Sequence, residues 1–238
     1  MSFEAGTIAD LAIANPNAIP ALEKLGIDYC CGGAATVAEA CRRAGVSPEQ
    51  LLALVGSADR PAGKAWDREP LSKLLEFIVG THHVYTRQAI ASLPPLATKV
   101  QGRHGPAHPE TRRVEELVHR LAADLAPHLQ KEEQILFPYI AALEEASGPG
   151  GAPAESCFGT VRNPIRMMMM EHDTAGELLR QLRATTNGYT LPGDACTSFQ
   201  ALYAGLTQLE EDLHRHIHLE NNILFPRAIE LEQAGRRT

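Results

Sequence analysis

The stretch HLQKEEQILFP at residues 128–138 recurs as HIHLENNILFP at residues 216–226. When the two segments are aligned from Asp124 and from Asp212, eight of fifteen positions are identical. The shared positions include a histidine, a glutamate four residues later and the sequence Ile-Leu-Phe-Pro. Copying of core residues alone would not keep two polar groups in register, so the repeat indicates a function for the histidine and the glutamate.

The composition is typical of a helical globular protein. Apolar residues make up 44% and charged residues 21% of the 238 positions, whereas aromatic residues make up only 5%, which favours helices over strands. The formal charge of −7 argues against nucleic acid or an anionic membrane as the main partner, and no apolar run approaches the roughly 20 residues of a membrane span. The N-terminus lacks the features of a signal peptide. We therefore expect a cytoplasmic protein whose five cysteines are thiols or ligands.

Helical patterns and chain-breaking residues predict two domains. Residues 1–57 contain short helical segments that end at Pro or Gly, residues 58–70 have the composition of a linker, and residues 71–238 carry four longer amphipathic patterns. The sequence predicts an all-α protein in which a small helical domain precedes an up-down four-helix bundle. The expected bundle helices cover residues 71–92, 110–146, 164–186 and 194–231.

The repeated histidine and glutamate lie on the apolar face of their expected helices. Residues four apart are separated by about 40° around a helix, so His128 and Glu132 share a face, and Leu121 and Leu125 lie on the same side. The second copy of the repeat has the same pattern. A buried imidazole or carboxylate is costly unless it is paired or bound to a metal.

Two lone histidines complete a symmetrical pattern. His83 precedes His128 by 45 residues, and His172 precedes His216 by 44, so each half of the expected bundle carries one lone histidine and one HxxxE. Imidazole and carboxylate donors suit iron, manganese or zinc, and two glutamates that can bridge favour a dinuclear site. The alternative is a structural network of buried polar residues without a metal.

Other metal patterns in the sequence fit the helix geometry less well. The ExxH pairs of ferritin-like bundles have counterparts in Glu116/His119 and Glu211/His214, but both histidines lie about 180–200° from the apolar stripe and are expected at the surface. Of the three histidines in HRHIH, only His216 is expected to face inward. HExxH is absent, which counts against a zinc protease.

At these residues the chain resembles the hemerythrin-like superfamily, and within it the Repair of Iron Centres family of di-iron proteins that repair iron–sulfur clusters. The resemblance is carried by HLQKEEQILFP, MEHDTAGELL, HIHLENNILFP and DYCCGG, the last at residues 28–33, and covers nearly the whole chain. It implies a hemerythrin-like bundle that holds two non-haem iron ions with a bridging oxo or hydroxo group. The implied metal ligands are His83, His128, Glu132, His172, His216 and Glu220, of which the two glutamates bridge the irons.

One position departs from the oxygen-carrying hemerythrins, which have a fifth histidine on the third helix. Gly176 stands at that position here, one turn after His172. The missing ligand implies more open coordination, which favours chemistry with small molecules or release of iron over oxygen carriage.

Five further residues are candidates for supporting roles. Cys30 and Cys31 of DYCCGG are candidates for accepting or delivering iron or for exchanging electrons, and a helix that starts shortly after them is expected to lower a thiol pKa; the alternative is a turn whose cysteines only pack. Glu171 is a candidate for a path to the irons. Asp124 and Asp212, each one turn before a ligand histidine, are candidates for orienting an imidazole or are surface charges.

Three functions remain open from the sequence. The leading expectation, from the resemblance, is repair of iron–sulfur clusters damaged by oxidative or nitrosative stress, through supply of iron. The alternatives are an enzyme that reduces nitric oxide or dioxygen, and a hemerythrin-like protein that senses a gas or stores iron. The expected partners are damaged iron–sulfur proteins, a reductant, and nitric oxide or dioxygen as small ligands; the oligomeric state stays open, with a dimer among the options.

Overall fold

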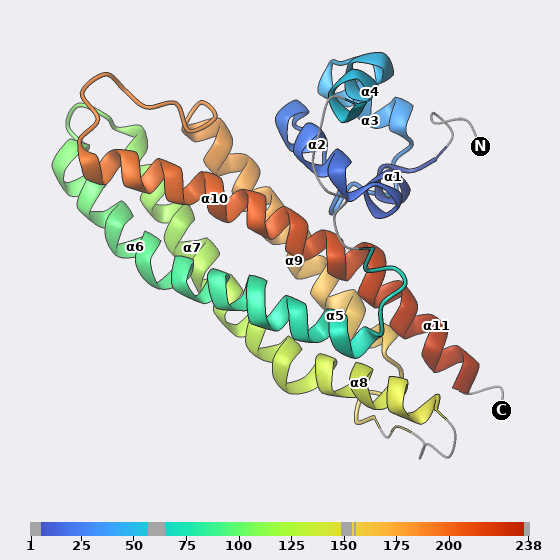
Figure 1. Cartoon of the computed structure of the whole chain (residues 1–238). Helices are drawn as coiled ribbons and strands as arrows, with labels where there is room; N and C mark the ends of the chain where they lie inside the picture. Colours follow the sequence, from blue (N-terminus) through green and yellow to red (C-terminus); the bar gives the residue numbers. More distant parts are fainter. Residues whose placement is uncertain (1–5, 57–64, 149–153, 155, 236–238) are drawn as a thin grey trace. The chain divides into compact units, whose positions relative to one another are not determined.

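The computed structural model describes residues 6–56, 65–148, 154 and 156–235. These residues form helices joined by turns, and their only extended pairing is an isolated bridge between Thr7 and Thr36 (Figure 1). The predicted all-α class is thereby confirmed. The predicted linker at residues 58–70 lies in part outside the described residues. Within the described chain, every helix is too short or too polar to cross a lipid bilayer.

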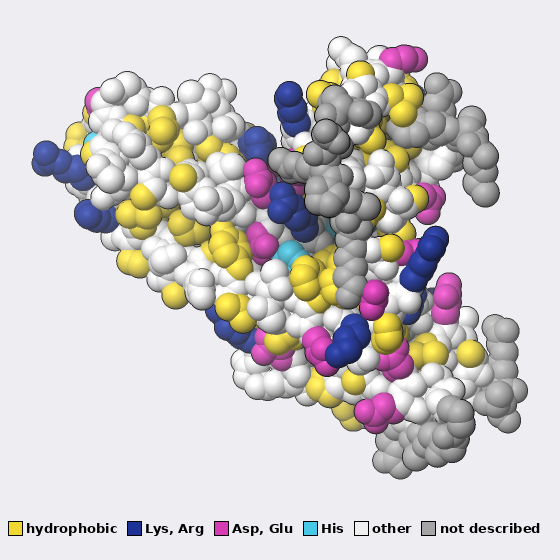
Figure 2. Space-filling model, viewed as in Figure 1, with side chains coloured by type: hydrophobic (Ala, Val, Ile, Leu, Met, Phe, Trp, Pro, Cys, Tyr) yellow, Lys and Arg dark blue, Asp and Glu magenta, His cyan; other side chains and the backbone are white. Residues whose placement is uncertain are grey.

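The described residues fall into two compact units. The bundle unit lies within residues 76–142 and 154–213, and the terminal unit lies within residues 1–75, 143–153 and 214–238. Side chains of both charge signs are mixed on the face of the molecule in Figure 2.

Four long helices lie side by side in the bundle unit (Figure 1). They are α6 (Val84–His104), α7 (Glu110–Lys131), α9 (Arg162–Thr185) and the first part of α10 (Thr197–Leu219). Each presents an apolar stripe, and Leu121, Leu182 and Leu206 from three of the stripes are at most 1% exposed in one shared core. Gly205 of α10 permits a close approach to α6, because a Cβ atom there would meet Leu93 Cδ2 at 2.7 Å. The predicted four-helix bundle is present in this unit.

The helix α6 extends further than the sequence predicted. The expected end was near residue 92, because Pro94 and Pro95 follow, but the helix continues to His104. A proline inside a helix removes a backbone donor and costs about 3 kcal/mol. The side chains of Pro94 and Ala97 are buried in the core, and this packing offsets the lost hydrogen bonds.

Three π-helical segments interrupt the helices that the sequence predicts as continuous. They are η3 (Ile78–His83), η4 (Glu132–Leu136) and η5 (Glu220–Leu224). In η4 the amide of Phe137 donates to the carbonyl of Glu132, five residues earlier, and in η5 Phe225 donates to Glu220. A proline follows each of these phenylalanines and has no amide hydrogen for the α-helical bond, so the wider turn is favoured there. Each π segment begins or ends at a predicted metal ligand.

Short capped helices form the N-terminal part of the terminal unit. They are α1 (Ile8–Ala14), η2 (Pro16–Ala18), α2 (Ile19–Leu25), α3 (Val37–Ala44) and α4 (Pro48–Gly56). Capping boxes start two of them: Thr7 and Asp10 exchange hydrogen bonds of 3.1 Å, and Thr36 and Glu39 exchange bonds of 3.2 Å. Helices this short are not stable alone, so they depend on these caps and on a core that contains Tyr29, which is 1% exposed.

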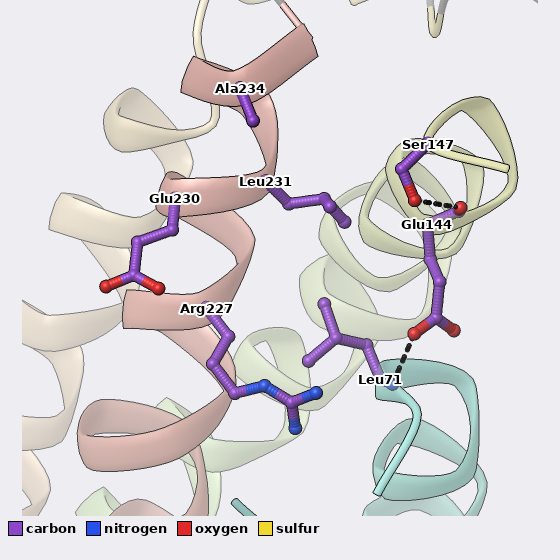
Figure 3. Close-up of a pocket in the computed structure, with 7 residues that line it drawn as sticks. All are labelled: Leu71, Glu144, Ser147, Arg227, Glu230, Leu231 and Ala234. Atoms are coloured by element: carbon purple, nitrogen blue, oxygen red, sulfur yellow. Dashed lines mark hydrogen bonds between the residues drawn. The ribbon is translucent and has the colours of Figure 1, made fainter. Parts of the chain in front are cut away.

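The terminal unit also contains the start of α5 (Leu71–Phe77), the end of α8 (Phe137–Ala146) and α11 (Phe225–Gly235). The Glu144 carboxylate accepts hydrogen bonds from the amides of Leu71 at 2.6 Å and Ser72 at 2.8 Å, which are otherwise unsatisfied at a helix start. Burial by itself would raise the pKa of Glu144, but the bonds from Ser72 and Leu71 outweigh it and lower the pKa below its ordinary value. Arg227 and Leu231 line a pocket beside this contact (Figure 3).

Candidate metal centre

Glu132 is the central residue of a buried polar cluster in the bundle unit. Its side chain is 0% exposed, and the Nε2 atoms of three histidines surround it. These atoms lie 3.4 Å from a Glu132 oxygen in His83, 3.4 Å in His128 and 4.0 Å in His172. Each imidazole is at most 3% exposed. The structure thus brings together four of the six predicted ligands within this unit.

The donor atoms of this cluster fit a metal cation better than a hydrogen-bonded network. Neither oxygen of Glu132 accepts a hydrogen bond from a described residue, and a buried carboxylate left this way is costly. The Nε2 atoms of His128 and His172 are 3.2 Å apart, so their lone pairs repel unless a proton or a cation lies between them. Ligand atoms of these three residues lie within 4.8 Å of one another. Imidazole and carboxylate donors that converge in this way suit a divalent transition metal.

Two further carboxylates interact with the Nδ1 atoms of these imidazoles, on the side of the ring away from Glu132. His83 Nδ1 lies 2.7 Å from Glu133 Oε1, and His128 Nδ1 lies 2.9 Å from Glu171 Oε2. A carboxylate acceptor places the imidazole proton on Nδ1, which leaves the Nε2 lone pair directed toward Glu132. Glu133 was not predicted as a site residue from the sequence, and Glu171 was predicted only as part of a path to the irons.

Each of these supporting carboxylates is also bonded to a cation. Arg87 donates to Glu133 at 2.6 Å, and Lys131 donates to Glu171. Burial by itself would raise the pKa of both carboxyl groups, but the hydrogen bonds from the cation and the imidazole outweigh it and hold each pKa below its ordinary value. Both groups are therefore ionised at neutral pH and act as permanent acceptors for the imidazole protons.

The other two predicted ligands lie in the terminal unit. His216, near the end of α10, has its Nε2 atom 3.0 Å from Oε1 of Glu220, the first residue of η5. Both side chains are at most 1% exposed. The pair has the same place in its helix as His128 and Glu132, which end α7 and open η4.

Gly176 is buried in α9, one turn after His172. No side chain at this position can donate to a cation, so the departure from oxygen-carrying hemerythrins is retained in the folded protein.

The two histidines of the sequence THH have different partners. His83 lies beside Glu132, whereas His82 Nδ1 lies 2.9 Å from Asp212. Asp212 therefore orients His82, whereas the sequence made it a candidate for orienting His216, one turn after it. Asp124, the equivalent residue of the first repeat, is half exposed and lies 3.8 Å from Arg120, as expected for a surface charge.

The prediction that only His216 of HRHIH faces inward is wrong. His218 is 2% exposed, and its Nδ1 atom lies 3.3 Å from the carbonyl oxygen of Tyr29. Burial lowers the pKa of His218 to about 4, so its imidazole is neutral at neutral pH. His214 is half buried, with Nδ1 3.1 Å from Glu23. Residues distant in sequence cover helix faces that an isolated bundle would expose.

The DYCCGG turn lies in the terminal unit and is organised by Asp28. Its Oδ1 atom accepts hydrogen bonds of 2.9–3.1 Å from the amides of Cys30, Cys31 and Gly32, and the two thiols, which form no disulfide, have their Sγ atoms 3.9 Å apart. The hydrogen bond to Cys31, followed by burial, raises the pKa of the Cys30 thiol well above its ordinary value. For Cys30 the predicted lowering of a thiol pKa is therefore wrong, and the following helix, α3, begins only at Val37.

Asn222 of η5 ties the cysteine turn to the segment that carries Glu220. Its Nδ2 atom donates to the carbonyl oxygens of Tyr29 at 3.1 Å and Cys30 at 3.4 Å. The contact requires a residue without a side chain at Gly33, where a Cβ atom would lie 2.9 Å from Tyr29 O and 3.2 Å from Asn222 Oδ1. The turn and the predicted ligand therefore belong to one packed region.

Known proteins resemble both parts of the chain. A family model described as the hemerythrin HHE cation binding domain matches residues 75–228, and a model described as a domain of unknown function (DUF542) matches residues 4–59. The iron-sulfur cluster repair protein YtfE of Citrobacter koseri is 37% identical over 230 residues, which cover 96% of this chain and 99% of the relative. Proteins of the same name from Escherichia coli and Shigella boydii are 36% identical with the same coverage. The buried His/Glu cluster thus lies in a region similar to a cation-binding domain.

Proposed function

The chain belongs to the hemerythrin HHE cation-binding domain family, and from this premise we propose that it repairs iron–sulfur clusters damaged by oxidative or nitrosative stress, by supplying iron. The observation that carries the proposal is the extent of the similarity to iron-sulfur cluster repair proteins, which covers 96% of the chain. It includes both the region of the buried His/Glu cluster and the DYCCGG turn. The clients are iron–sulfur proteins whose cluster has lost iron or has been nitrosylated.

Two non-haem iron ions with a bridging oxo or hydroxo group are the proposed contents of the centre. Their ligands are His83, His128, Glu132, His172, His216 and Glu220, all of which lie within the residues matched by the family model. Support comes from the Glu132 carboxylate, which is buried among three imidazoles and accepts no hydrogen bond from the residues that the structure describes. Iron held by these residues would supply a redox couple and an ion that can be released.

The surrounding residues keep these ligands ready for a cation. Glu133 and Glu171 hold the protons of two imidazoles on Nδ1, away from Glu132. Arg87 and Lys131 balance the charge of these carboxylates, so that the supporting groups add little net charge to the site. Glu171 is 29% exposed, and we assign it to the path by which iron or protons enter and leave.

The DYCCGG turn is the proposed place of thiol chemistry during transfer. Cys30 is buried and holds its proton, whereas Cys31 is half buried and is the more accessible of the two sulfurs. A thiol that binds iron must give up its proton, and the raised pKa of Cys30 opposes that loss. Asn222 links this turn to the segment that carries Glu220.

The test is reactivation of a nitrosylated iron–sulfur enzyme by the iron-loaded protein without oxygen. We expect recovery beyond that given by an equal amount of free Fe²⁺, with a matching fall in iron per chain. Recovery no greater than with free Fe²⁺ would rule out iron supply. Multiple turnovers of nitric oxide under steady reductant, with iron retained, would instead identify a reductase.

A cysteine variant tests the role of the turn. The Cys30→Ser, Cys31→Ser protein is expected to bind iron normally and to repair more slowly, while Cys157→Ser, at an exposed cysteine, serves as the matched control. Normal repair by the double variant would remove the turn from the function.

A further inference from the structure

A second group of metal-ligand side chains lies in the bundle unit where α6 ends and α10 begins. It contains His104, His108 and Asp194, whose ligand atoms lie close together, and Cys196, which contacts His104. None of these residues belongs to the repeat. His104 is the last of the 21 residues of α6, which begins directly after His83, so the two histidines lie about 30 Å apart along the helix axis. The group is therefore distinct from the Glu132 cluster.

The donor atoms of this group already converge in the folded chain. His104 Nε2 lies 3.0 Å from Cys196 Sγ, and His108 Nε2 lies 2.9 Å from Asp194 Oδ1. Ligand atoms of the two histidines and Asp194 all lie within 4.8 Å of one another. A tetrahedral zinc ion with Zn–N near 2.0 Å and Zn–S near 2.3 Å separates its ligands by roughly 3.3–3.8 Å. The donors of His104, His108 and Asp194 are therefore near this spacing, and the Cys196 thiol is next to one of them, His104.

Neighbouring residues hold the two imidazoles in place. Nδ1 of His108 lies 3.3 Å from Glu110. A carboxylate therefore lies beside the Nδ1 atom of this histidine, as Glu133 does for His83. Both rings of the group pack on Phe199, which is 0% exposed, with ring centroids 5.2 Å away for His104 and 5.7 Å for His108. A fully buried ring under two half-buried imidazoles restricts their rotamers, which lowers the entropy lost on binding.

Cys196 has the features of a ligand thiol. It directly precedes α10, and hydrogen bonding from the amide of Phe199, followed by the interaction with His104, lowers its pKa to about 7. The thiol is exposed and free, so a cation can reach it from solvent.

We propose that His104, His108, Asp194 and Cys196 form a second metal site that binds one Zn²⁺ ion. Two imidazoles, a carboxylate and a thiolate make a mixed N, O and S donor set, which suits tetrahedral zinc, whereas the Glu132 cluster has no sulfur donor. The site lies at the surface, so it exchanges its ion with solvent more readily than the buried cluster does.

Cobalt is the probe that separates the two sites. The full chain is first loaded with iron and then titrated with Co²⁺, which takes tetrahedral zinc sites and gives a thiolate-to-metal charge-transfer band. We expect about one Co²⁺ per chain with this band, loss of the band on addition of Zn²⁺, and iron that stays bound. Cys196→Ser should abolish the band. His108→Ala and Asp194→Asn should each weaken Co²⁺ binding by about tenfold or more, because loss of a residue that only supports a metal ligand already lowers affinity by that much.

Three controls make the result specific. Cys157→Ser and the Cys30→Ser, Cys31→Ser protein should retain the band, and circular dichroism checks that each variant is folded. In the unaltered protein, Zn²⁺ should slow alkylation of Cys196 by iodoacetamide, measured on the Cys196 peptide. No thiolate band, a band that survives Cys196→Ser, or alkylation that Zn²⁺ does not slow would each overturn the site.

Discussion

The two clusters of ligand-type side chains in the bundle unit differ in how their donors are satisfied. Around Glu132 every imidazole is at most 3% exposed, and the carboxylate accepts no hydrogen bond from the described chain. At the cluster of His104 and Cys196 the donors are half buried or exposed and already form pairs of about 3 Å. The buried cluster therefore needs a cation to offset desolvation, whereas the surface cluster persists as a hydrogen-bonded group without one.

Glu132→Gln should show the largest effect. We expect metal affinity at the buried cluster to fall by more than about 100-fold, since loss of a group that only supports a ligand already costs 10–100-fold. The metal-free variant should unfold at no lower temperature than the metal-free parent, because a neutral amide is easier to bury than a carboxylate. Iron per chain and thermal unfolding measure the two effects, with the exposed Glu145→Gln as control. A metal-free variant that unfolds much earlier would indicate a structural polar network instead.

Glu133→Gln and Glu171→Gln should have the next largest effect. Each removes the charge that holds an imidazole proton on Nδ1, and iron affinity in a chelator competition should fall about 10–100-fold. Asp124→Asn, at a surface carboxylate that lies beside Arg120, should leave the iron affinity unchanged.

The same two variants should alter the pH dependence of stability. Because the pKa of each carboxyl group is lowered from 4.5 in the folded chain, its contribution is present above that pH and is lost as pH falls through the folded pKa. The difference in unfolding free energy between parent and Glu171→Gln, measured without metal, should therefore shrink below pH 4.5. A difference that grows on acidification would contradict the assigned ionisation.

Phe199→Leu should have a smaller effect on metal binding, and this effect should be confined to the surface cluster. It removes the ring under His104 and His108, so Co²⁺ affinity should fall about tenfold, with a loss of about 1–2 kcal/mol of unfolding free energy. Ile165→Val in α9 is the matched control, since it should cost about 1 kcal/mol without changing Co²⁺ binding. Equal Co²⁺ affinities in the two variants would show that Phe199 does not position the imidazoles.

Glu144→Gln should have the smallest effect, on stability alone. A neutral oxygen accepts the amide bonds of Leu71 and Ser72 less strongly than a carboxylate, so unfolding free energy at pH 7 should drop by about 1 kcal/mol. The pKa of Glu144 is lowered from 4.5, so the difference should vanish as pH falls below that value. Urea unfolding at pH 7 and at low pH measures it, and a change in iron content would contradict a purely structural role.

Much of the Glu132 cluster was predictable because its pattern is local. Because His128 and Glu132 are four residues apart on an apolar stripe, they share a helix face, and this holds for any element that packs against that face. Glu133 was missed because it has no repeat counterpart: Asn221 stands at the equivalent position. The π segments were missed as well, although the proline that follows Phe in both copies of the repeat is a signal for them.

The surface cluster was hidden by the error at Pro94 and Pro95. The expected helices end near residue 92 and begin again at residue 110, so His104 was not expected on a helix, although it ends α6; His108 does lie between α6 and α7. The contacts to Asp194 and Cys196 join residues 86 and 92 positions apart, and nothing in the local pattern relates them.

The amino-acid sequence by itself determined the helical class, the apolar stripes and the positions of the repeated His and Glu, because helix periodicity depends on residues within a few turns. Only the tertiary structure decided that Glu133 and Glu171 hold imidazole protons, that Tyr29 buries His218, and that His104 meets Cys196. These contacts depend on which helix faces pack together, and that choice minimises the exposed apolar surface and the unpaired polar groups of the whole chain rather than of any one segment.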